Sequence, residues 1–390
     1  CAGKTATMHF TLHLSPRCNM RCGYCYSPPA DGPAMTPEIG RRVLDMAAQT
    51  GEKSCGIIFF GGEPLLHRDL IYDLVDYGEA HPTGQRYHFK VTTNGVLLDE
   101  AFLAYSLRHH MLVAMSFDGI REAHDAHRRF PDGRPTFEYL LPRLQLLLAA
   151  RPYSSVYTVV NPDTARYLAE SVAFLAELGA RYLIVSLNYA APWDEASFAV
   201  LARQCEKLGD LYIQWTRANR KFYLSPLEVK LSSHINRDCY HQDRCELAQR
   251  QLSVDHEGDL YPCVQFVRAG REGGWCIGNV FDGIDEFARQ RIRAASSQEK
   301  EFCADCAVKG RCNNTCGCLN WQTTGTVNAV SPVLCRYEQM LMKVADRVGK
   351  KLYRERNALF LHKHYNAAYP VLSLLEDATG PAGPVSSPRV

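Results

Sequence analysis

Short β-rich runs alternate with amphipathic helical stretches between residues 9 and 190. In chain order the runs read HFTLHL, GIIFFG, YHFKVTT, LVAMSF, SVYTVV and YLIVSL, and helical patterns such as PEIGRRVLDMAAQ and FEYLLPRLQLLLAA lie between them. Because strand and helix alternate, the sheet is predicted to be parallel. Six such units predict an α/β fold, a partial (β/α)6 TIM-like barrel, with its chemistry at the carboxyl ends of the strands.

The rest of the chain follows a different pattern. We predict a barrel domain over residues 1–190, a helical linker over 191–235, a cysteine-rich domain over 236–340, a C-terminal helical segment over 341–376 and a disordered tail over 377–390. The cysteine-rich domain shows no hydrophobic periodicity that could build a large core, so bound metal is expected to supply part of its stability.

Charge and hydropathy exclude several classes of partner. The 390 residues are 46% hydrophobic and 22% charged, as in an ordinary soluble globular protein. The net charge is only +2 and the basic residues are scattered, so no nucleic-acid partner is predicted. No apolar run is long enough to span a bilayer, and the first residues lack the features of a signal peptide. We therefore predict no membrane partner and a cytoplasmic location.

Sixteen cysteines are many for a protein of a reducing compartment, where thiols persist as metal ligands or nucleophiles. Most are grouped, whereas Cys1, Cys55, Cys205 and Cys276 stand alone and are interpreted as small buried hydrophobes. The first group lies in SPRCNMRCGYCYSPP, directly after the first strand. Its spacing alone allows disulfide halves, zinc ligands or an iron-sulfur cluster.

Four further segments decide between these alternatives. The spacing CxxxCxxC of Cys18, Cys22 and Cys25, with an aromatic residue before the last cysteine, resembles the signature of radical S-adenosylmethionine (SAM) enzymes. FFGGEPLL, VTTNG and SFDG follow the next three strands in order, and HDAHR comes after them, as in that family. The resemblance implies that the three thiolates hold a 4Fe-4S cluster whose fourth iron binds SAM.

The resemblance also implies which residues lie near SAM. The glycines of the GGEP turn would let the backbone approach the SAM amino group, because glycine has no Cβ. Arg128 would pair with the SAM carboxylate, although an arginine on a loop is more often a solvated charge. The residues implied to contact SAM are Tyr24, Gly61, Gly62, Glu63, Pro64, Thr93, Asn94, Ser116 and Arg128.

The later cysteines resemble the SPASM extension of peptide-modifying radical SAM enzymes. The matching segments are CELAQRQLSVDHEGDLYPC and CADCAVKGRCNNTC, followed by one more cysteine. The resemblance implies two auxiliary 4Fe-4S clusters, the first held by Cys239, Cys245, Cys263 and Cys316 and the second by Cys303, Cys306, Cys312 and Cys335. A pair of tetrahedral zinc sites is the alternative. Cys318 lies outside the pattern and is interpreted as structural, or as acting near the second cluster.

Together the motifs imply a radical SAM oxidoreductase that contains three 4Fe-4S clusters and SAM. Such an enzyme abstracts hydrogen from its substrate with a 5′-deoxyadenosyl radical. The cysteine spacing is similar to that of anaerobic sulfatase maturases, which form formylglycine from Cys or Ser. Those enzymes carry an aspartate after the cysteine of YPCD, whereas this chain has Val264 there.

We therefore predict a maturase that oxidatively installs a thioether or carbon-carbon crosslink in a ribosomally made peptide, with sulfatase maturation as the alternative. The expected partners are a precursor peptide and a reductant such as flavodoxin or ferredoxin. A non-enzymatic electron-transfer protein would need no SAM site, so the GGEP and TTNG segments count against it.

Overall fold

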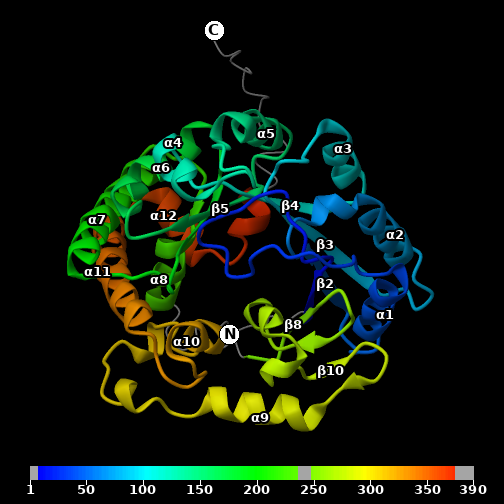
Figure 1. Cartoon of the computed structure of the whole chain (residues 1–390). Coiled ribbons are helices and arrows are strands. Elements are labelled where there is room, and N and C mark those ends of the chain that lie inside the picture. Colours follow the sequence, from blue (N-terminus) through cyan, green and yellow to red (C-terminus); the bar gives the residue numbers. More distant parts are fainter. Residues whose placement is uncertain (1–7, 236–246, 374–390) are drawn as a thin grey trace.

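A single curved sheet of nine strands, in the order β7-β6-β5-β4-β3-β2-β1-β8-β9, organises the molecule (Figure 1). The computed structural model describes residues 8–235 and 247–373. The six predicted strands are confirmed and all pair in parallel with their neighbours; a short seventh strand follows them. These strands are β1 (Met8–His13), β2 (Ser54–Phe60), β3 (Arg86–Thr93), β4 (Leu112–Ser116), β5 (Ser155–Val160), β6 (Tyr182–Leu187) and β7 (Tyr223–Leu224).

Helices cover the outer face of this partial barrel (Figure 1). They are α1 (Pro37–Ala48), η1 (Pro64–His67), α2 (Arg68–Glu79), α3 (Glu100–Arg108), α4 (Arg121–His127), α5 (Phe137–Ala150), η2 (Ala165–Tyr167) and α6 (Leu168–Glu177). The first helix illustrates why they form: the Thr36 side chain caps it by accepting a hydrogen bond from the Ile39 amide, and Pro37 occupies its first turn. Its buried side chains, among them Val43 and Leu44, face the sheet.

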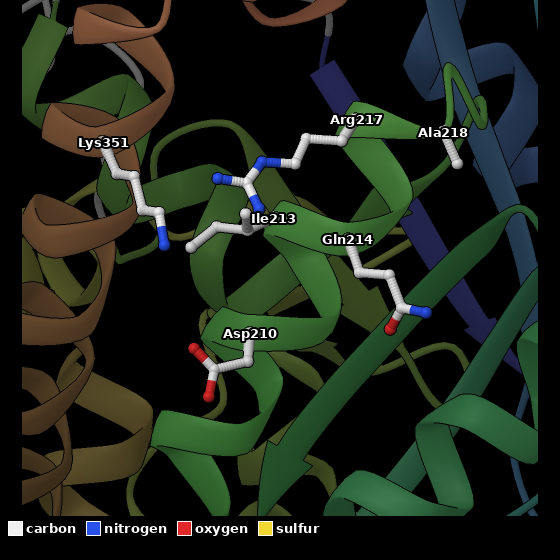
Figure 2. A pocket seen from close by; sticks show the side chains of 6 residues that line it. All are labelled: Asp210, Ile213, Gln214, Arg217, Ala218 and Lys351. Carbon is white, nitrogen blue, oxygen red and sulfur yellow. The ribbon is translucent and has the colours of Figure 1, made fainter.

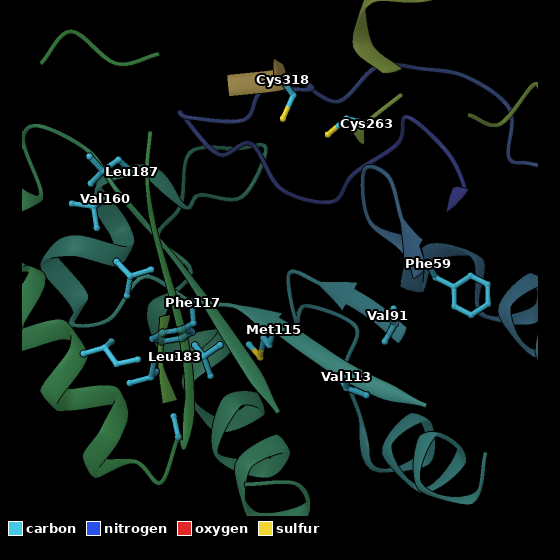
Figure 3. Packing of buried hydrophobic residues seen from close by; sticks show 14 of the residues in the cluster. Phe59, Val91, Val113, Met115, Phe117, Val160, Leu183, Leu187, Cys263 and Cys318 are labelled. Carbon is cyan, nitrogen blue, oxygen red and sulfur yellow. The ribbon is translucent and has the colours of Figure 1, made fainter. Parts of the chain in front are cut away.

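The main core lies between the strands and these helices (Figure 3). Side chains on the outward face of successive strands, such as Phe59, Val91 and Val113, are almost completely buried. The inward face carries polar residues instead, among them Thr11 and Lys90. This alternation leaves the interior of the barrel available for chemistry.

The cysteine-rich region continues the barrel sheet. Its first strand, β8 (Gln251–Val254), pairs in parallel with β1, and β9 (Leu260–Tyr261) pairs with β8 in an antiparallel manner. The rest consists of short elements: η4 (Val264–Ala269), η5 (Arg271–Gly273), β10 (Gly278–Asn279), β11 (Gly283–Ile284), α9 (Glu286–Ser297), η6 (Glu301–Cys303), η7 (Lys309–Arg311) and α10 (Gly317–Thr324). The yellow and orange segments in Figure 1 thus extend the ring beyond β1.

Long helices join the two regions. The segment predicted as a linker contains α7 (Glu195–Arg217), β7 and α8 (Ser225–Ile235). Helix α11 (Pro332–Arg354) packs against both α7 and α8, and α12 (Ala358–Tyr365) follows it. Helix α11 begins before residue 341, so it crosses the predicted boundary between the cysteine-rich domain and the C-terminal helical segment. The predicted tail lies outside the described residues. Within residues 8–235 and 247–373, no helix is long and apolar enough to cross a bilayer.

Candidate functional site

The first cysteine group lies on the loop between β1 and α1, at the carboxyl end of β1. Backbone hydrogen bonds fix this loop to the residues that end α4. The Arg21 amide donates to the Arg129 carbonyl at 2.8 Å, and the Gly23 amide donates to the His127 carbonyl at 2.9 Å. The loop is therefore a braced element rather than a free connection.

Burial makes these three thiols weak acids in the absence of metal. It raises the pKa of Cys18 to about 12 and also raises the pKa of Cys22 and of Cys25. Cys25 donates its S–H to the Ser27 carbonyl at 2.9 Å. Since thiolates bind iron, loading this site should release protons.

The GGEP turn touches the cysteine loop itself. The Gly62 amide donates to the Ser15 carbonyl and the Glu63 amide to the Arg17 carbonyl, both at 2.9 Å. Gly61 has a φ of 122°, in the region that favours glycine. A Cβ at Gly62 would lie 2.0 Å from the Arg17 carbonyl oxygen. In this protein the glycines thus permit close approach to the chain's own loop, whatever they also do for SAM.

Gly62→Ala is therefore expected to displace the cysteine loop. The added methyl would meet backbone rather than a flexible side chain, so we expect the free energy of unfolding to fall by about 1–3 kcal/mol. Gly84→Ala is the comparison: no atom lies within 4 Å of a Cβ there, so its φ of 69° is the one source of strain and the loss of stability should be smaller. The measurement is thermal unfolding of the two variants and the wild type. Equal stability of the G62A variant and the wild type would contradict the close approach.

Glu63 links the second and third strands to the cysteine loop. Its carboxylate, 1% exposed, accepts hydrogen bonds from the Thr93 hydroxyl at 2.6 Å, the Asn94 amide at 2.7 Å and the Leu65 amide at 3.0 Å. Burial raises the pKa of this carboxyl, and these bonds partly offset the effect. The Asn94 side chain in turn lies 3.5 Å from the Cys18 sulfur. Four of the residues predicted from the sequence are thus brought together, while Pro64 begins η1 beside them.

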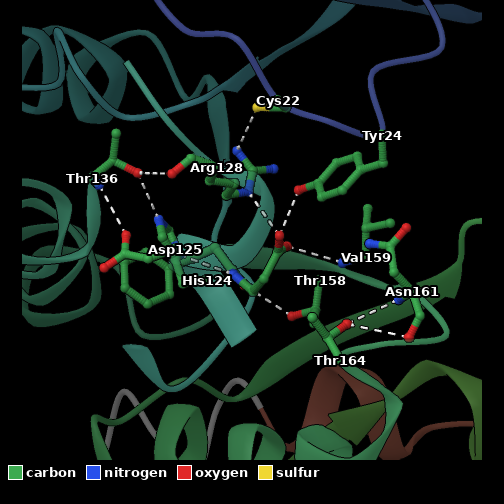
Figure 4. A network of polar contacts seen from close by, with 12 residues as sticks. Cys22, Tyr24, His124, Asp125, Arg128, Thr136, Thr158, Val159, Asn161 and Thr164 are labelled. Carbon is green, nitrogen blue, oxygen red and sulfur yellow. Dashed lines mark hydrogen bonds and ion pairs between the residues drawn. The ribbon is translucent and has the colours of Figure 1, made fainter. Parts of the chain in front are cut away.

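Asp118 joins Tyr24, Arg128 and Val159 in a buried polar network (Figure 4). One carboxylate oxygen accepts from the Tyr24 hydroxyl at 2.6 Å and from Arg128 Nε at 3.2 Å, and the other accepts from the Val159 amide at 3.0 Å. The Arg128 guanidinium also lies 4.0 Å from the Cys22 sulfur. Arg128 pairs through Nε with the Asp118 carboxylate, and its expected contact with the SAM carboxylate stays a prediction.

This network sets the charge states of Arg128 and Tyr24. Burial acts to lower the pKa of Arg128, but the neighbouring Tyr24, Asp118 and Cys22 outweigh it and raise that pKa. Burial raises the pKa of Tyr24 well above its usual value, so the phenol stays protonated and donates. Ser116, another predicted contact, lies at the carboxyl end of β4, on the same rim of the barrel.

The first auxiliary group contains a thiol that the sequence pattern did not assign to it. Cys263 directly precedes η4 and Cys316 directly precedes α10, and both are buried. Cys318 lies beside them, with its sulfur 3.4 Å from that of Cys316. Cys318, interpreted from the sequence as structural or as acting near the second cluster, therefore lies with the first group. Cys239 and Cys245 lie outside the described residues.

Hydrogen bonding sets the pKa values of this trio. The bonds from Cys318 lower the pKa of Cys263 and of Cys316, and backbone amides at the start of each helix act in the same direction. The same bonds raise the pKa of Cys318 well above the usual thiol value. Amide donors to sulfur are a feature of iron-sulfur sites, where they tune the reduction potential.

The second auxiliary group lies between η6, η7 and the start of α11. Cys303, Cys306 and Cys335 are close enough for the first two to raise the pKa of the third, after burial. Cys312 directly follows η7, and after burial the carboxylate of Glu338 on α11 raises the pKa of its thiol. All four predicted ligands therefore come from one small region.

The spacing of the described thiols bears on the metal that they could hold. A tetrahedral zinc ion, with Zn–S bonds of about 2.3 Å, would hold its sulfurs within about 4 Å of one another. Over residues 8–235 and 247–373, the only group of three or more candidate ligands whose atoms all lie within 4.8 Å is Asp255, Glu257 and Asp259, so no three described cysteines are that close. All-thiol donor sets of this kind fit iron-sulfur clusters, and a pair of zinc sites stays the alternative.

Tyr26 lies between the first cysteine group and the first auxiliary group. Its hydroxyl is buried without a hydrogen-bond partner among the described residues. After burial, the thiols of Cys263, Cys25 and Cys318 are the groups that raise its pKa. Arg268 of η4 donates to the Tyr26 carbonyl at 3.1 Å, so the two regions touch here.

Two hollows differ in their relation to these residues. One of about 540 Å³, between α7 and α11, is lined by Asp210, Ile213, Gln214, Arg217, Ala218 and Lys351 (Figure 2). None of these is a predicted site residue. Another of about 340 Å³ is lined by Cys18 and its loop neighbours Arg17, Asn19 and Arg21, with Leu66 and His67 opposite. The cysteine loop is thus accessible from this side.

Family models match both halves of the chain. The model for the radical SAM superfamily matches residues 12–175, and the SPASM model, an iron-sulfur cluster-binding domain, matches residues 245–307. SAM and iron-sulfur clusters are the cofactors that these domains imply. The first match ends within α6 and so covers most of the barrel, and the second covers the start of the cysteine-rich region.

Relatives of known activity span most of the chain. A serine-type anaerobic sulfatase-maturating enzyme of Klebsiella aerogenes is 24% identical over 318 residues, which cover 78% of this chain and 78% of that protein. The radical SAM cyclopropyl synthase TigE of Paramaledivibacter caminithermalis is 21% identical over 374 residues, covering 88% of this chain and 75% of that one.

Solved structures show the same fold. Native anSMEcpe with bound AdoMet has a TM-score of 0.76 at 18% identity and covers 89% of this chain and 99% of its own. Streptococcus suis SuiB bound to precursor peptide SuiA has a TM-score of 0.60 at 17% identity, with coverage of 85% and 76%. The cysteine loop, the auxiliary thiols and these matches together show that the chain belongs to the radical SAM superfamily and is a radical SAM enzyme with a C-terminal SPASM domain.

Proposed function

We propose that this enzyme oxidises a ribosomally made peptide and installs a thioether or carbon-carbon crosslink. The observation that carries this choice is Val264, which follows Cys263 where the sulfatase maturases keep an aspartate. It lies in η4 and packs against the core. A valine cannot accept a proton, so the base of formylglycine formation is missing at this position.

Two buried acidic groups near the cysteine loop are already engaged. Glu63 and Asp118 accept several hydrogen bonds each, and Asp118 also pairs with Arg128. Asp259, farther along the cysteine-rich region, pairs with Arg271. None of these carboxylates takes the place of the aspartate of the maturases.

Each group of cysteines would have its own role in the reaction. Cys18, Cys22 and Cys25 would hold the cluster that binds SAM, on a loop braced by the GGEP turn. When bound, these cofactors supply a 5′-deoxyadenosyl radical that abstracts hydrogen from carbon. The barrel wall excludes water from the reacting groups. The eight auxiliary thiols of the predicted pattern would hold two clusters that accept the one electron left on the peptide after hydrogen abstraction. The peptide would then lose two electrons per crosslink, one with the hydrogen atom taken by the radical and one to a cluster, and a proton would leave with the second electron.

Sulfatase maturation is the second candidate, favoured by the similarity to the Klebsiella aerogenes enzyme. TigE and SuiB support the first candidate, because the former is a cyclopropyl synthase and the latter was solved with a precursor peptide. The substrate of this chain is expected to be of the same class, a peptide or protein.

Incubation with a sulfatase-type Cys or Ser peptide and SAM should therefore give no formylglycine. Under the same anaerobic, reducing conditions, a short cysteine-containing precursor peptide should lose two hydrogens and become crosslinked. Mass spectrometry detects the crosslink, and an aldehyde-specific reagent detects formylglycine. The control is the chain carrying C18A/C22A/C25A, which should give neither product. An aldehyde product that depends on SAM would favour sulfatase maturation instead.

A further inference from the structure

A buried ion pair lies beside the second auxiliary group of cysteines. Lys230 of α8 and Glu338 of α11 are 2% and 5% exposed, and the Lys230 Nζ lies 2.5 Å from the Glu338 Oε2. The two helices come from distant parts of the sequence and pack against each other. Both charged groups have therefore been removed from water and depend on each other.

The pair holds the loop that carries Cys312. The Glu338 carboxylate accepts from the Asn313 amide at 2.9 Å. Lys230 also donates to the Arg311 carbonyl at 3.4 Å. The charges thus contact the two residues that flank Cys312, a predicted cluster ligand.

Stability alone does not account for such a pair. Replacing a buried ion pair by apolar side chains of similar volume is often neutral or stabilising, because removing two charges from water is costly. A second ionic contact next to it, between Arg311 and Asp346, is more exposed and braces the same loop from the outside. The Arg311–Asp346 contact would hold the Cys312 loop even without the buried charges of Lys230 and Glu338.

We propose that Lys230 and Glu338 set the reduction potential of the second auxiliary cluster. When Cys312 binds iron it loses its proton, and the Glu338 carboxylate then faces a negatively charged cluster. Lys230 offsets that charge from the other side. Net charge near an iron-sulfur cluster is one of the factors that fix its potential. The proposal rests on the assignment of Cys312 to this cluster and is independent of the substrate.

The signs follow from electrostatics. Removing the negative charge of Glu338 makes reduction easier, so E338Q should shift the potential of one auxiliary cluster to a more positive value. Removing the positive charge of Lys230 makes reduction harder, so K230Q should shift the same transition in the opposite direction. In K230Q/E338Q the two effects should largely cancel, because the net charge beside the cluster is then unchanged.

The test is an EPR-monitored redox titration of the full chain, reconstituted anaerobically, with no substrate present. E355Q is the matched control, because Glu355 ends the same helix in an exposed pair with Arg217, far from any described thiol. Iron content is measured on every variant. If K230Q loses iron, E338Q and the double variant still report the effect.

Two outcomes would overturn the proposal. One is an unchanged auxiliary potential in E338Q, and the other is a shift in the same direction in both single variants. The absence of a second auxiliary signal in the wild type would overturn the cluster assignment as well. A failure to crosslink peptides would leave this titration unaffected, so the two proposals fail separately.

Discussion

The chain carrying C18A/C22A/C25A is expected to form no 5′-deoxyadenosine from SAM. Without these thiolates there is no site-differentiated cluster to bind and reduce SAM, while the auxiliary thiols lie on separate elements and remain. Iron should therefore fall from about twelve to about eight atoms per chain, because one of three four-iron clusters is lost. Anaerobic reconstitution, iron and sulfide analysis and chromatography of the SAM products measure both quantities.

Cys276→Ala is the control for this experiment. Cys276 is a solitary, half-buried cysteine whose thiol donates to the Gly278 carbonyl. Its replacement should leave both iron content and SAM cleavage unchanged. Deoxyadenosine formation by the triple variant would place SAM cleavage at another site, and a wild type with about four irons, or with zinc, would contradict the assignment of the auxiliary cysteines.

Asp118→Asn is expected to cause a large loss of stability. The substitution leaves the Arg128 guanidinium buried without its carboxylate, and breaking a buried pair in this way costs about 3–5 kcal/mol. Because Arg128 also lies against Cys22, the cluster loop should loosen, and a chelator should remove iron faster from this site. Thermal unfolding and the rate of iron release measure the two effects.

Asp163→Asn is the matched control. Asp163 forms a similar contact with His127, but its side chain is 62% exposed, and such surface pairs contribute little. Stability of D118N equal to that of D163N would show that Asp118 does not hold the network together.

The barrel could be predicted from the sequence because its strands are short β-rich runs, several with alternating apolar and polar residues, separated by helical patterns. The alternation of β-rich runs with helical stretches depends only on local sequence, and β1 to β6 follow it. The cysteine loop and the GGEP turn could also be located, since each directly follows a strand. Their mutual contacts through Gly62 and Glu63 agree with that placement.

The contacts that depend on tertiary packing could not be predicted. Asp118 stands in the SFDG segment, but nothing local shows that it pairs with Arg128 rather than with solvent. Cys318 follows Cys316 by two positions, and only the approach of η4 to α10 places it beside Cys263. Lys230 and Glu338 likewise come from different helices. Such pairs carry no periodic signal.

The pairing of β1 with β8 has a consequence for synthesis of the protein. His9 pairs with Gln251, so one edge of the first strand stays open until well over half of the chain has left the ribosome. At ordinary translation speeds this takes roughly tens of seconds, during which an unpaired edge invites association with other chains. Nascent chains that end before Gln251 are therefore expected to bind chaperones and to aggregate when chaperones are depleted.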